Sequence, residues 1–315
     1  MSEFDLIREY FLWQPVPDNV RISVGDDAAV LQIAPGKELV VSVDTSNAGI
    51  HFPLETPPHA IGYKSLAVNL SDLAAMCADP AWFTLALSLP AADKVWVGEF
   101  ARGMRELAEQ HGIFLIGGDT TRGALSITIQ VMGWAEPNQA LLRSGAQPGD
   151  LICVSGTLGD AAAGLAVVQE RLVLPPAAAA FCVQRLNYPL PRLALANLLR
   201  GKATACMDIS DGLLADLGHL LKASGVGAQL QHGLLPFSAT LAQLPLAQRL
   251  GFALSGGDDY ELLFTLPKVH WDDVKNQAEA QQIQVTVIGK VDANQQDLQI
   301  DYTLPDQRLG YEHFS

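Results

Sequence analysis

The chain has 315 residues, of which 49% are hydrophobic and 17% are charged, a composition that supports two folded domains or one large one with little disorder. Its formal net charge of −14 argues against a nucleic-acid or anionic-membrane surface, because either partner requires a basic patch. Anionic small molecules fit this charge only if metal ions mask the local carboxylates.

In the first half of the chain, apolar runs typical of strands alternate with Ala- and Leu-rich runs typical of helices. The predicted strands are residues 39–43, 83–89, 114–116 and 125–134. The predicted helices are residues 60–78 and 95–111, and Gly112 is well placed to end the second one.

A polar stretch that contains Pro137, Gly145 and Pro148 then interrupts this pattern and predicts a domain boundary. The second half has predicted strands at residues 151–155, 203–207, 261–266 and 285–291, and a predicted helix at 211–224. Since strands and helices are mixed in both halves, we expect a two-domain α/β or α+β fold. The expected domains are residues 1–137 and 138–315.

The sequence predicts a soluble, cytoplasmic protein. The first ten residues carry four charges and do not form a signal peptide. No run of about 18 uncharged apolar residues predicts a membrane span. The cysteines are widely separated and are typical of reduced, buried thiols, not of a disulfide frame or a zinc site: Cys77, Cys153, Cys182 and Cys206.

Aspartates recur at predicted strand ends and beside glycine turns in both halves of the chain. One of these alone is typical of a turn or a helix cap, but α/β proteins also place ligand chemistry at strand ends. The set is Asp26, Asp27, Asp44, Asp119, Asp208, Asp211, Asp258 and Asp259.

Asp72 is the most informative single aspartate. It lies in a predicted helix that is apolar almost all round, and its polar exceptions Ser65, Asn69 and Asp72 are spaced i, i+4 and i+7. This spacing puts the three side chains on one narrow face. We expect this face to contact an internal polar site; the alternative is a thin strip of solvent.

Gathered carboxylates require cations, because two of them about 5 Å apart repel by roughly 3 kcal/mol at an effective dielectric near 20. Oxygen ligands select hard ions such as Mg²⁺, which usually bridges to substrate phosphates. Backbone N–H groups at Ser210, Asp211 and Gly212 are a further candidate for phosphate binding, although Asp211 can equally be a cap. P-loop, Rossmann and protein-kinase motifs are absent from the sequence.

In this order, the motifs resemble the thiamine-monophosphate kinase family, of the superfamily that includes aminoimidazole ribonucleotide synthetase and selenophosphate synthetase. The resemblance spans nearly the whole chain. It is carried by residues 25–30 (Gly-Asp-Asp-Ala-Ala-Val), 42–45, 51–52, 69–76 (Asn-Leu-Ser-Asp-Leu-Ala-Ala-Met), 117–120, 207–213 (Met-Asp-Ile-Ser-Asp-Gly-Leu), 254–262 and 310–314.

The resemblance implies that ATP phosphorylates thiamine monophosphate to thiamine diphosphate, in a homodimer that assembles through the N-terminal sheet, with several Mg²⁺ ions bound. It implies metal positions at Asp27, Ser42, Asp44, Asp72, Asp119, Asp208 and Asp211. It implies nucleotide contacts at Gly118, Asp119, Arg143 and Ser210, and substrate contacts at His51, at Asp258 or Asp259, and at Tyr311.

Two alternatives remain open from the sequence. One is another enzyme of this superfamily, although the chain has no cysteine before Cys77 and so lacks the reactive N-terminal residue of a selenophosphate synthetase. The other is a non-catalytic regulator that binds metal and nucleotide, and formation of thiamine diphosphate distinguishes the enzyme from it.

Overall fold

The computed structural model describes residues 3–293, 298–302 and 310. The chain divides into two compact units, one of Met1–Leu73 with Ala78–Asn138 and one of Ala74–Cys77 with Gln139–Ser315. Each contains both helices and strands, as expected for the two-domain mixed fold.

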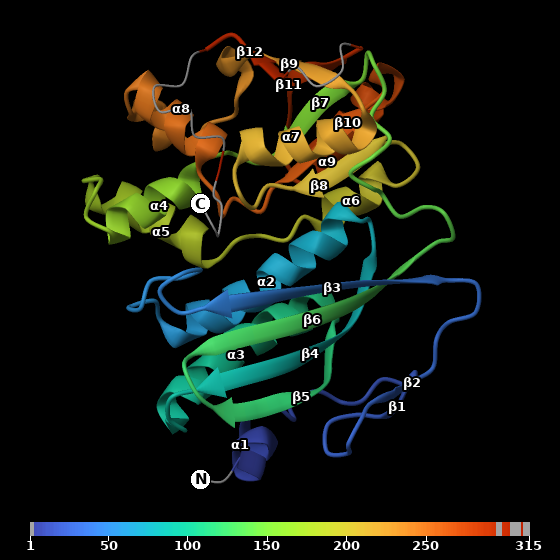
Figure 1. The fold of residues 1–315 in the computed structure, drawn as a ribbon, viewed down its shortest axis with the longest axis vertical. Helices are drawn as coiled ribbons and strands as arrows, with labels where there is room; N and C mark the ends of the chain where they lie inside the picture. The colour runs from blue at the N-terminus through green and yellow to red at the C-terminus, as the bar shows by residue number, and fades with distance from the viewer. Residues whose placement is uncertain (1–2, 294–297, 303–309, 311–315) are drawn as a thin grey trace. The chain divides into compact units, whose positions relative to one another are not determined.

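The first unit contains a mixed sheet in the order β3-β6-β4-β5, in which β4 and β5 are parallel and the other neighbours are antiparallel (Figure 1). The strands of this unit are β1 (Val20–Ile22), β2 (Val30–Leu31), β3 (Glu38–Asn47), β4 (Asp79–Leu89), β5 (Phe114–Arg122) and β6 (Ser126–Ala135). Its helices are α1 (Glu3–Tyr10), α2 (Pro58–Ala75) and α3 (Lys94–His111).

Helices α2 and α3 cover one face of this sheet (Figure 1). The sequence explains both: α2 is largely apolar and mostly buried, whereas α3 is amphipathic. The carboxylate of Asp93 caps the first turn of α3, and Gly112 ends the helix at φ 62°, a left-handed conformation that glycine adopts without a Cβ penalty.

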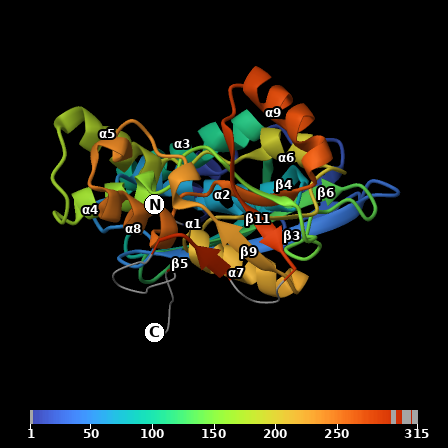
Figure 2. The same ribbon diagram turned by 90° about the horizontal axis from the view of Figure 1, so that it is seen from above.

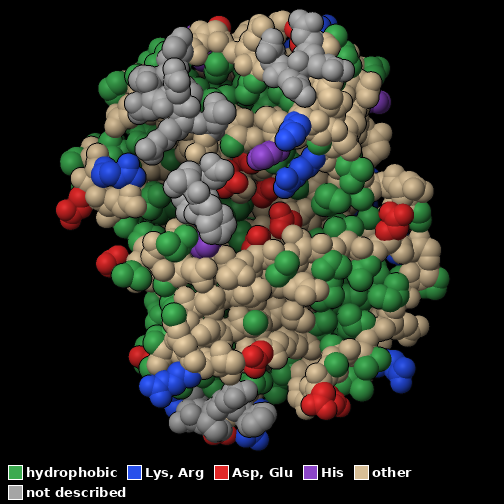
Figure 3. Space-filling view, in the orientation of Figure 1, with side chains coloured by type: hydrophobic (Ala, Val, Ile, Leu, Met, Phe, Trp, Pro, Cys, Tyr) green, Lys and Arg blue, Asp and Glu red, His purple; other side chains and the backbone are tan. Residues whose placement is uncertain are grey.

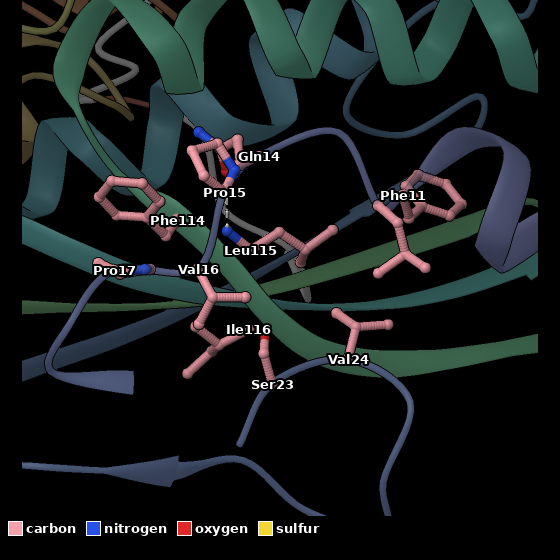
Figure 4. Close-up of a pocket in the computed structure, with 11 residues that line it drawn as sticks. Phe11, Gln14, Pro15, Val16, Pro17, Ser23, Val24, Phe114, Leu115 and Ile116 are labelled. Atoms are coloured by element: carbon pink, nitrogen blue, oxygen red, sulfur yellow. Dashed lines mark hydrogen bonds between the residues drawn. The ribbon is translucent and has the colours of Figure 1, made fainter. Parts of the chain in front are cut away.

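The opposite face of the sheet is covered only at one end. There Val20 of β1 packs in a small cluster with Trp82 and Met132. Beside this cluster, the Gln14 side chain bonds to the backbone at the start of the edge strand β5. Its oxygen accepts from the N–H of Leu115 at 3.3 Å (Figure 4), and its amide nitrogen donates to the carbonyl of Ile113 at 3.0 Å. Gln14 therefore pairs backbone groups at one sheet edge.

The second unit contains a sheet in the order β12-β9-β11-β7-β10-β8, antiparallel except between β12 and β9. Its strands are β7 (Leu151–Ser155), β8 (Ala205–Asp208), β9 (Gly227–Leu230), β10 (Leu262–Leu266), β11 (Val285–Asp292) and β12 (Leu298–Ile300). Its helices are α4 (Asp160–Val168), α5 (Pro176–Asn187), α6 (Leu193–Leu199), α7 (Leu213–Ser224), α8 (Leu246–Ser255) and α9 (Trp271–Ala280).

Helices lie on both faces of this second sheet. Figures 1 and 2 show α7 on one face and α6 with α9 on the other. The main core of the unit joins buried side chains of α7 and α8 to the inward residues of the sheet, among them Leu217, Leu254 and Val154. A smaller cluster around Cys182 and Leu241 packs α4 against α5. Within the described residues, no helix is both long enough and apolar enough to cross a membrane.

The structure corrects three expected boundaries. Strands β3 and β5 continue past Asp44 and Asp119, so these residues lie inside strands and not at their ends. The continuation of β3 is polar, and the Thr45 hydroxyl is hydrogen-bonded to that of Thr128 on the neighbouring strand, with the two oxygens 2.8 Å apart. Helix α7 begins at Leu213 instead of Asp211, because Gly212 has a φ of 118° that is not helical.

Candidate functional site

Ser42, Asp44 and Asp72 form an oxygen-rich group in the first unit. The Ser42 hydroxyl donates to Oδ2 of Asp72 at 2.5 Å, across from β3 to α2. Burial raises the pKa of Asp44 to about 6, and the negative charge of Asp72 beside it adds to this rise. The carboxylates of Asp44 and Asp72 thus lie next to each other at one face of the sheet, and only a proton or a cation relieves their mutual repulsion.

This group fits a hard divalent cation. It offers two carboxylates and a hydroxyl, without nitrogen or sulfur ligands, and oxygen-only sets favour Mg²⁺ over zinc or copper. Among the described residues, no group of three or more His, Cys, Asp or Glu side chains is arranged to hold a metal ion. A Mg²⁺ ion held by Asp44 and Asp72 would therefore take most of its ligands from elsewhere, as is usual for Mg²⁺ that bridges to phosphates.

The three members of the polar stripe on α2 have different roles. Asn69 and Ser65 are buried, 1% and 3% exposed, and Asp72 is half-buried. The Asn69 amide donates to the carbonyl of Ser65, within its own helix, at 2.9 Å. Asp72 instead accepts from Ser42 on the sheet. Asp72 thus has a polar partner outside its helix, as the expected internal polar site requires.

Asp119 lies on the opposite face of the sheet from Asp44. By strand register, Asp119 is level with Ala86, which is level with Thr128, which is level with Thr45. Laterally paired residues point to the same face, and neighbours along a strand to opposite faces. Two strands separate β3 from β5, which corresponds to about 14 Å at the usual strand spacing. One copy of the chain therefore does not bring Asp119 to Asp44.

In the Gly-Gly-Asp motif, Gly118 is the position at which the backbone requires a glycine. Its φ is +154°, and a Cβ there would overlap the carbonyl oxygen of Leu85 on the neighbouring strand. We expect Gly118→Ala to destabilise the first unit by about 2 kcal/mol or more, because backbone atoms cannot yield as a side chain can. Gly117→Ala is the matched control, since a Cβ at Gly117 would meet nothing within 4 Å. Equal unfolding midpoints in urea for the two variants would contradict this interpretation.

Two further predicted residues of the first unit lie in loops. Asp27 is exposed, and its backbone N–H donates to the Asp26 carboxylate at 2.8 Å. His51 accepts a hydrogen bond at Nδ1 from the backbone N–H of Asn47 at 3.0 Å. This contact assigns the remaining proton of a neutral His51 ring to Nε2, which can then donate to an anionic ligand.

In the second unit, Asp208 ends β8 and leads into the loop that carries Ser210 and Asp211. Three successive N–H groups of this loop, from Ser210 to Gly212, donate to a single carboxylate oxygen of Asp216. Burial raises the pKa of Asp216 to about 7, although the three N–H donors oppose this rise. The expectation that these N–H groups are available to a phosphate is therefore wrong.

The structure distinguishes the two neighbouring aspartates that sequence reasoning left equivalent. Asp259 is 2% exposed, and its carboxylate accepts the N–H of Gly159 at 2.8 Å. Burial raises its pKa well above the ordinary value. Asp258 is half-buried and has a φ of 70°. The buried Asp259 thus stabilises the fold, and Asp258 is the aspartate that a ligand can reach.

A buried ionic cluster next to Asp259 escaped the sequence analysis. Glu261, 1% exposed, accepts from Arg185 at 2.8 Å, from Arg192 at 2.5 Å and from the Ser155 hydroxyl at 2.5 Å. Burial works to raise the pKa of Glu261, but the two arginines and Ser155 together hold it below its ordinary value. The sequence does carry one signal of this cluster: Glu261 comes directly before an apolar strand, where a charged side chain is unusual.

Two predicted residues remain. Arg143 is exposed, and its carbonyl oxygen accepts from the Ser224 hydroxyl at 3.2 Å. Tyr311 lies outside the described residues.

Comparisons with known proteins agree with the two-unit division and with these motifs. Residues 25–135 match the family model of the AIR synthase related protein, N-terminal domain, and residues 147–301 match that of its C-terminal domain. Thiamine-monophosphate kinase from Escherichia coli (strain K12) is 48% identical over 278 residues, which cover 85% of this chain and 84% of the relative. The chain belongs to the thiamine-monophosphate kinase family.

Solved structures of thiamine-monophosphate kinases support the same membership. The crystal structure of the kinase from Stenotrophomonas maltophilia K279a is 46% identical, with a TM-score of 0.87, and covers 95% of this chain and 96% of that one. A structure described as AaThiL complexed with AMPPCP and TMP is 31% identical, with a TM-score of 0.78, and covers 99% of this chain and 96% of that one.

Proposed function

We propose that this protein uses ATP to phosphorylate thiamine monophosphate, with thiamine diphosphate and ADP as products. The observation that carries the proposal is the match, over nearly the full chain, to a structure complexed with AMPPCP and TMP. The test is to incubate the protein with ATP, Mg²⁺ and thiamine monophosphate and to separate the products by chromatography. Thiamine diphosphate and ADP in equal amounts support the proposal; ADP without thiamine diphosphate contradicts it.

We assign the binding roles from the family motifs together with the local geometry. Asp44 and Asp72 bind Mg²⁺ with Ser42, and the raised pKa of Asp44 beside Asp72 supports this assignment. Asp27, Asp119, Asp208 and Asp211 complete the metal positions. Gly118, Asp119, Arg143 and Ser210 contact the nucleotide. Thiamine monophosphate contacts His51, Asp258 and Tyr311, whereas Asp259 has a structural role.

The chemistry requires positioning more than acid–base catalysis. A phosphate oxygen of thiamine monophosphate forms a bond to the γ-phosphorus of ATP, the bond to the β,γ-bridging oxygen breaks, and ADP leaves with that electron pair. The attacking oxygen is already anionic, so no side chain has to remove a proton. Bound Mg²⁺ supplies neutralisation of the phosphoryl charge. The side chains of this protein hold the two anions in line and keep them from separating.

We further propose a homodimer that assembles through the open face of the first sheet. Three aliphatic side chains of β3 are exposed on this face: Leu39 (41%), Val41 (49%) and Val43 (58%). Figure 3 shows few charged side chains over this sheet. An apolar, weakly charged face is typical of an interface. Asp119 points to this open face and Asp44 to the covered one. A second copy can therefore bring its own Asp119 to the Asp44 of the first only around β3, which is an edge strand of the sheet.

A complementation experiment tests this shared site. Asp44→Asn and Asp119→Asn are each expected to be inactive as purified homodimers. Co-expressed, they should recover about a quarter of wild-type activity, because half of the dimers are mixed and each mixed dimer has one intact site. If the mixture stays as inactive as its parents, Asp119 does not serve the other copy.

We also propose a cytoplasmic location. All four cysteines are free and buried, which suits a reducing compartment.

A further inference from the structure

Asp216 is a buried carboxylate for which the proposed reaction has no direct use. It lies in the first turn of α7 and is 2% exposed. Its Oδ2 atom accepts hydrogen bonds from three consecutive backbone N–H groups, those of Ser210 at 3.0 Å, Asp211 at 3.1 Å and Gly212 at 3.2 Å. One oxygen thus holds the whole loop that leads from β8 into the helix.

The start of α7 is capped by Asp216 and not by a side chain at the N-cap position. Gly212 occupies the N-cap position with φ 118° and makes no side-chain cap bond. Helix starts normally satisfy such donors by a capping side chain, by water or by an anion. Here a residue from inside the helix reaches back to them. The N–H groups converge on one point, as they do around a bound phosphate, and the Asp216 carboxylate occupies that point.

The other edge of the same loop is also fixed. The carbonyl oxygens of Ile209 and Ser210 accept from the N–H groups of Tyr260 at 2.8 Å and Asp258 at 2.9 Å. These bonds continue the β8–β10 ladder beyond its strands. The loop is therefore held through its N–H groups by Asp216 and through its carbonyl oxygens by the segment that carries Asp258. The N–H groups of Ser210, Asp211 and Gly212 are therefore not available to a ligand.

We infer that Asp216 is a positioning residue, which holds the loop from Asp208 to Gly212 in the shape that binding of Mg²⁺ and nucleotide requires. The inference rests on the proposed roles of Asp208, Ser210 and Asp211 and extends them to a residue that touches neither ion nor substrate. Phosphoryl groups then bind to this loop through its side chains and the metal, because the three backbone N–H groups are already bonded to Asp216.

Asp216→Asn tests the inference, since it keeps the shape of the side chain and weakens its bonds to the three donors. We expect the Mg²⁺ concentration for half-maximal activity to rise about tenfold or more, as it does when residues behind metal ligands are changed. The KM for thiamine monophosphate should rise by a smaller factor, because Asp216 bonds to the metal-binding loop alone. Asp272→Asn, an exposed first-turn aspartate of α9, is the matched control and should leave the Mg²⁺ requirement unchanged.

The half-maximal Mg²⁺ concentration separates positioning from mere stability. Because Mg²⁺ binds the folded state, partial unfolding raises the half-maximal value in inverse proportion to the folded fraction, which is less than about twofold for a variant that circular dichroism shows to be more than half folded. The expected tenfold rise exceeds this effect. An unchanged value in Asp216→Asn would therefore overturn the inference, whatever happens to the rate. Mg²⁺-dependent binding of AMPPCP, measured by calorimetry on both proteins, gives the same comparison without turnover. It stays informative even if the wild type makes no thiamine diphosphate, a result that would refute the proposed function alone.

Discussion

Asp44→Asn is expected to lower the rate of thiamine diphosphate formation by about a thousandfold, which corresponds to about 4 kcal/mol of lost transition-state stabilisation. The same change should make the metal-free protein more stable. Asp44 is forced beside Asp72 and has its pKa raised to about 6 from an ordinary value of 3.8. At neutral pH the folded state therefore carries an unfavourable charge that asparagine removes, a gain on the order of 2 kcal/mol.

The pH dependence follows from the direction of this shift. Because the folded state binds the Asp44 proton more tightly than the unfolded state does, wild-type stability should rise as the pH falls from above 6 towards 4. In Asp44→Asn this rise should be absent. Thermal unfolding in a chelator, at intervals between pH 4 and 8, measures both proteins. Asp18→Asn, an exposed aspartate of the same unit, is the control for the change of charge alone. A variant that is active, or that is less stable than wild type at pH 7, contradicts the assignment.

Glu261→Gln is expected to destabilise the second unit by about 3 kcal/mol, because it leaves two largely buried arginines without their shared anion. Arg185 and Arg192 have side chains only 14% and 16% exposed, and both contact Glu261. Urea unfolding followed by circular dichroism measures the loss. The control is Glu279→Gln on α9, where an exposed i,i+4 pair with Lys275 should contribute less than about 0.5 kcal/mol.

The same cluster predicts an acid limit. The pKa of Glu261 is held below its ordinary value of 4.5 in the folded protein, so its contribution is present above that value and is lost as the pH falls through the folded-state pKa. The stability difference between wild type and Glu261→Gln should therefore shrink only below about pH 4.5. A difference that disappears at neutral pH, or that is no larger than the Glu279→Gln effect, would show that the ion pairs do not stabilise this unit.

The sequence predicted the mixed two-domain fold because hydrophobic periodicity is local and strong in both halves. It also indicated that Asp72, on an otherwise apolar helix, contacts a polar site, and the structure confirms this contact with Ser42. Long elements such as α3, with the Asp93 cap and Gly112 at its end, carry their boundaries in local chemistry.

What the sequence could not supply is the face and partner of each side chain. Asp119 follows two glycines, but only strand register shows that it points away from Asp44. Asp258 and Asp259 have the same local sequence signals, and only the tertiary contact with Gly159 distinguishes them. The bond from Asp216 back to the preceding loop and the pairing of Glu261 with Arg185 both depend on packing that no local pattern encodes.

The proposed reaction depends on divalent cations bound by the carboxylates of Asp44 and Asp72. The most direct test counts Mn²⁺ ions bound per chain by electron paramagnetic resonance, at saturating AMPPCP and thiamine monophosphate, in wild type and in Asp44→Asn. We predict that the variant binds at least one ion fewer than wild type. The same number of ions, bound with the same affinity in both proteins, would contradict it.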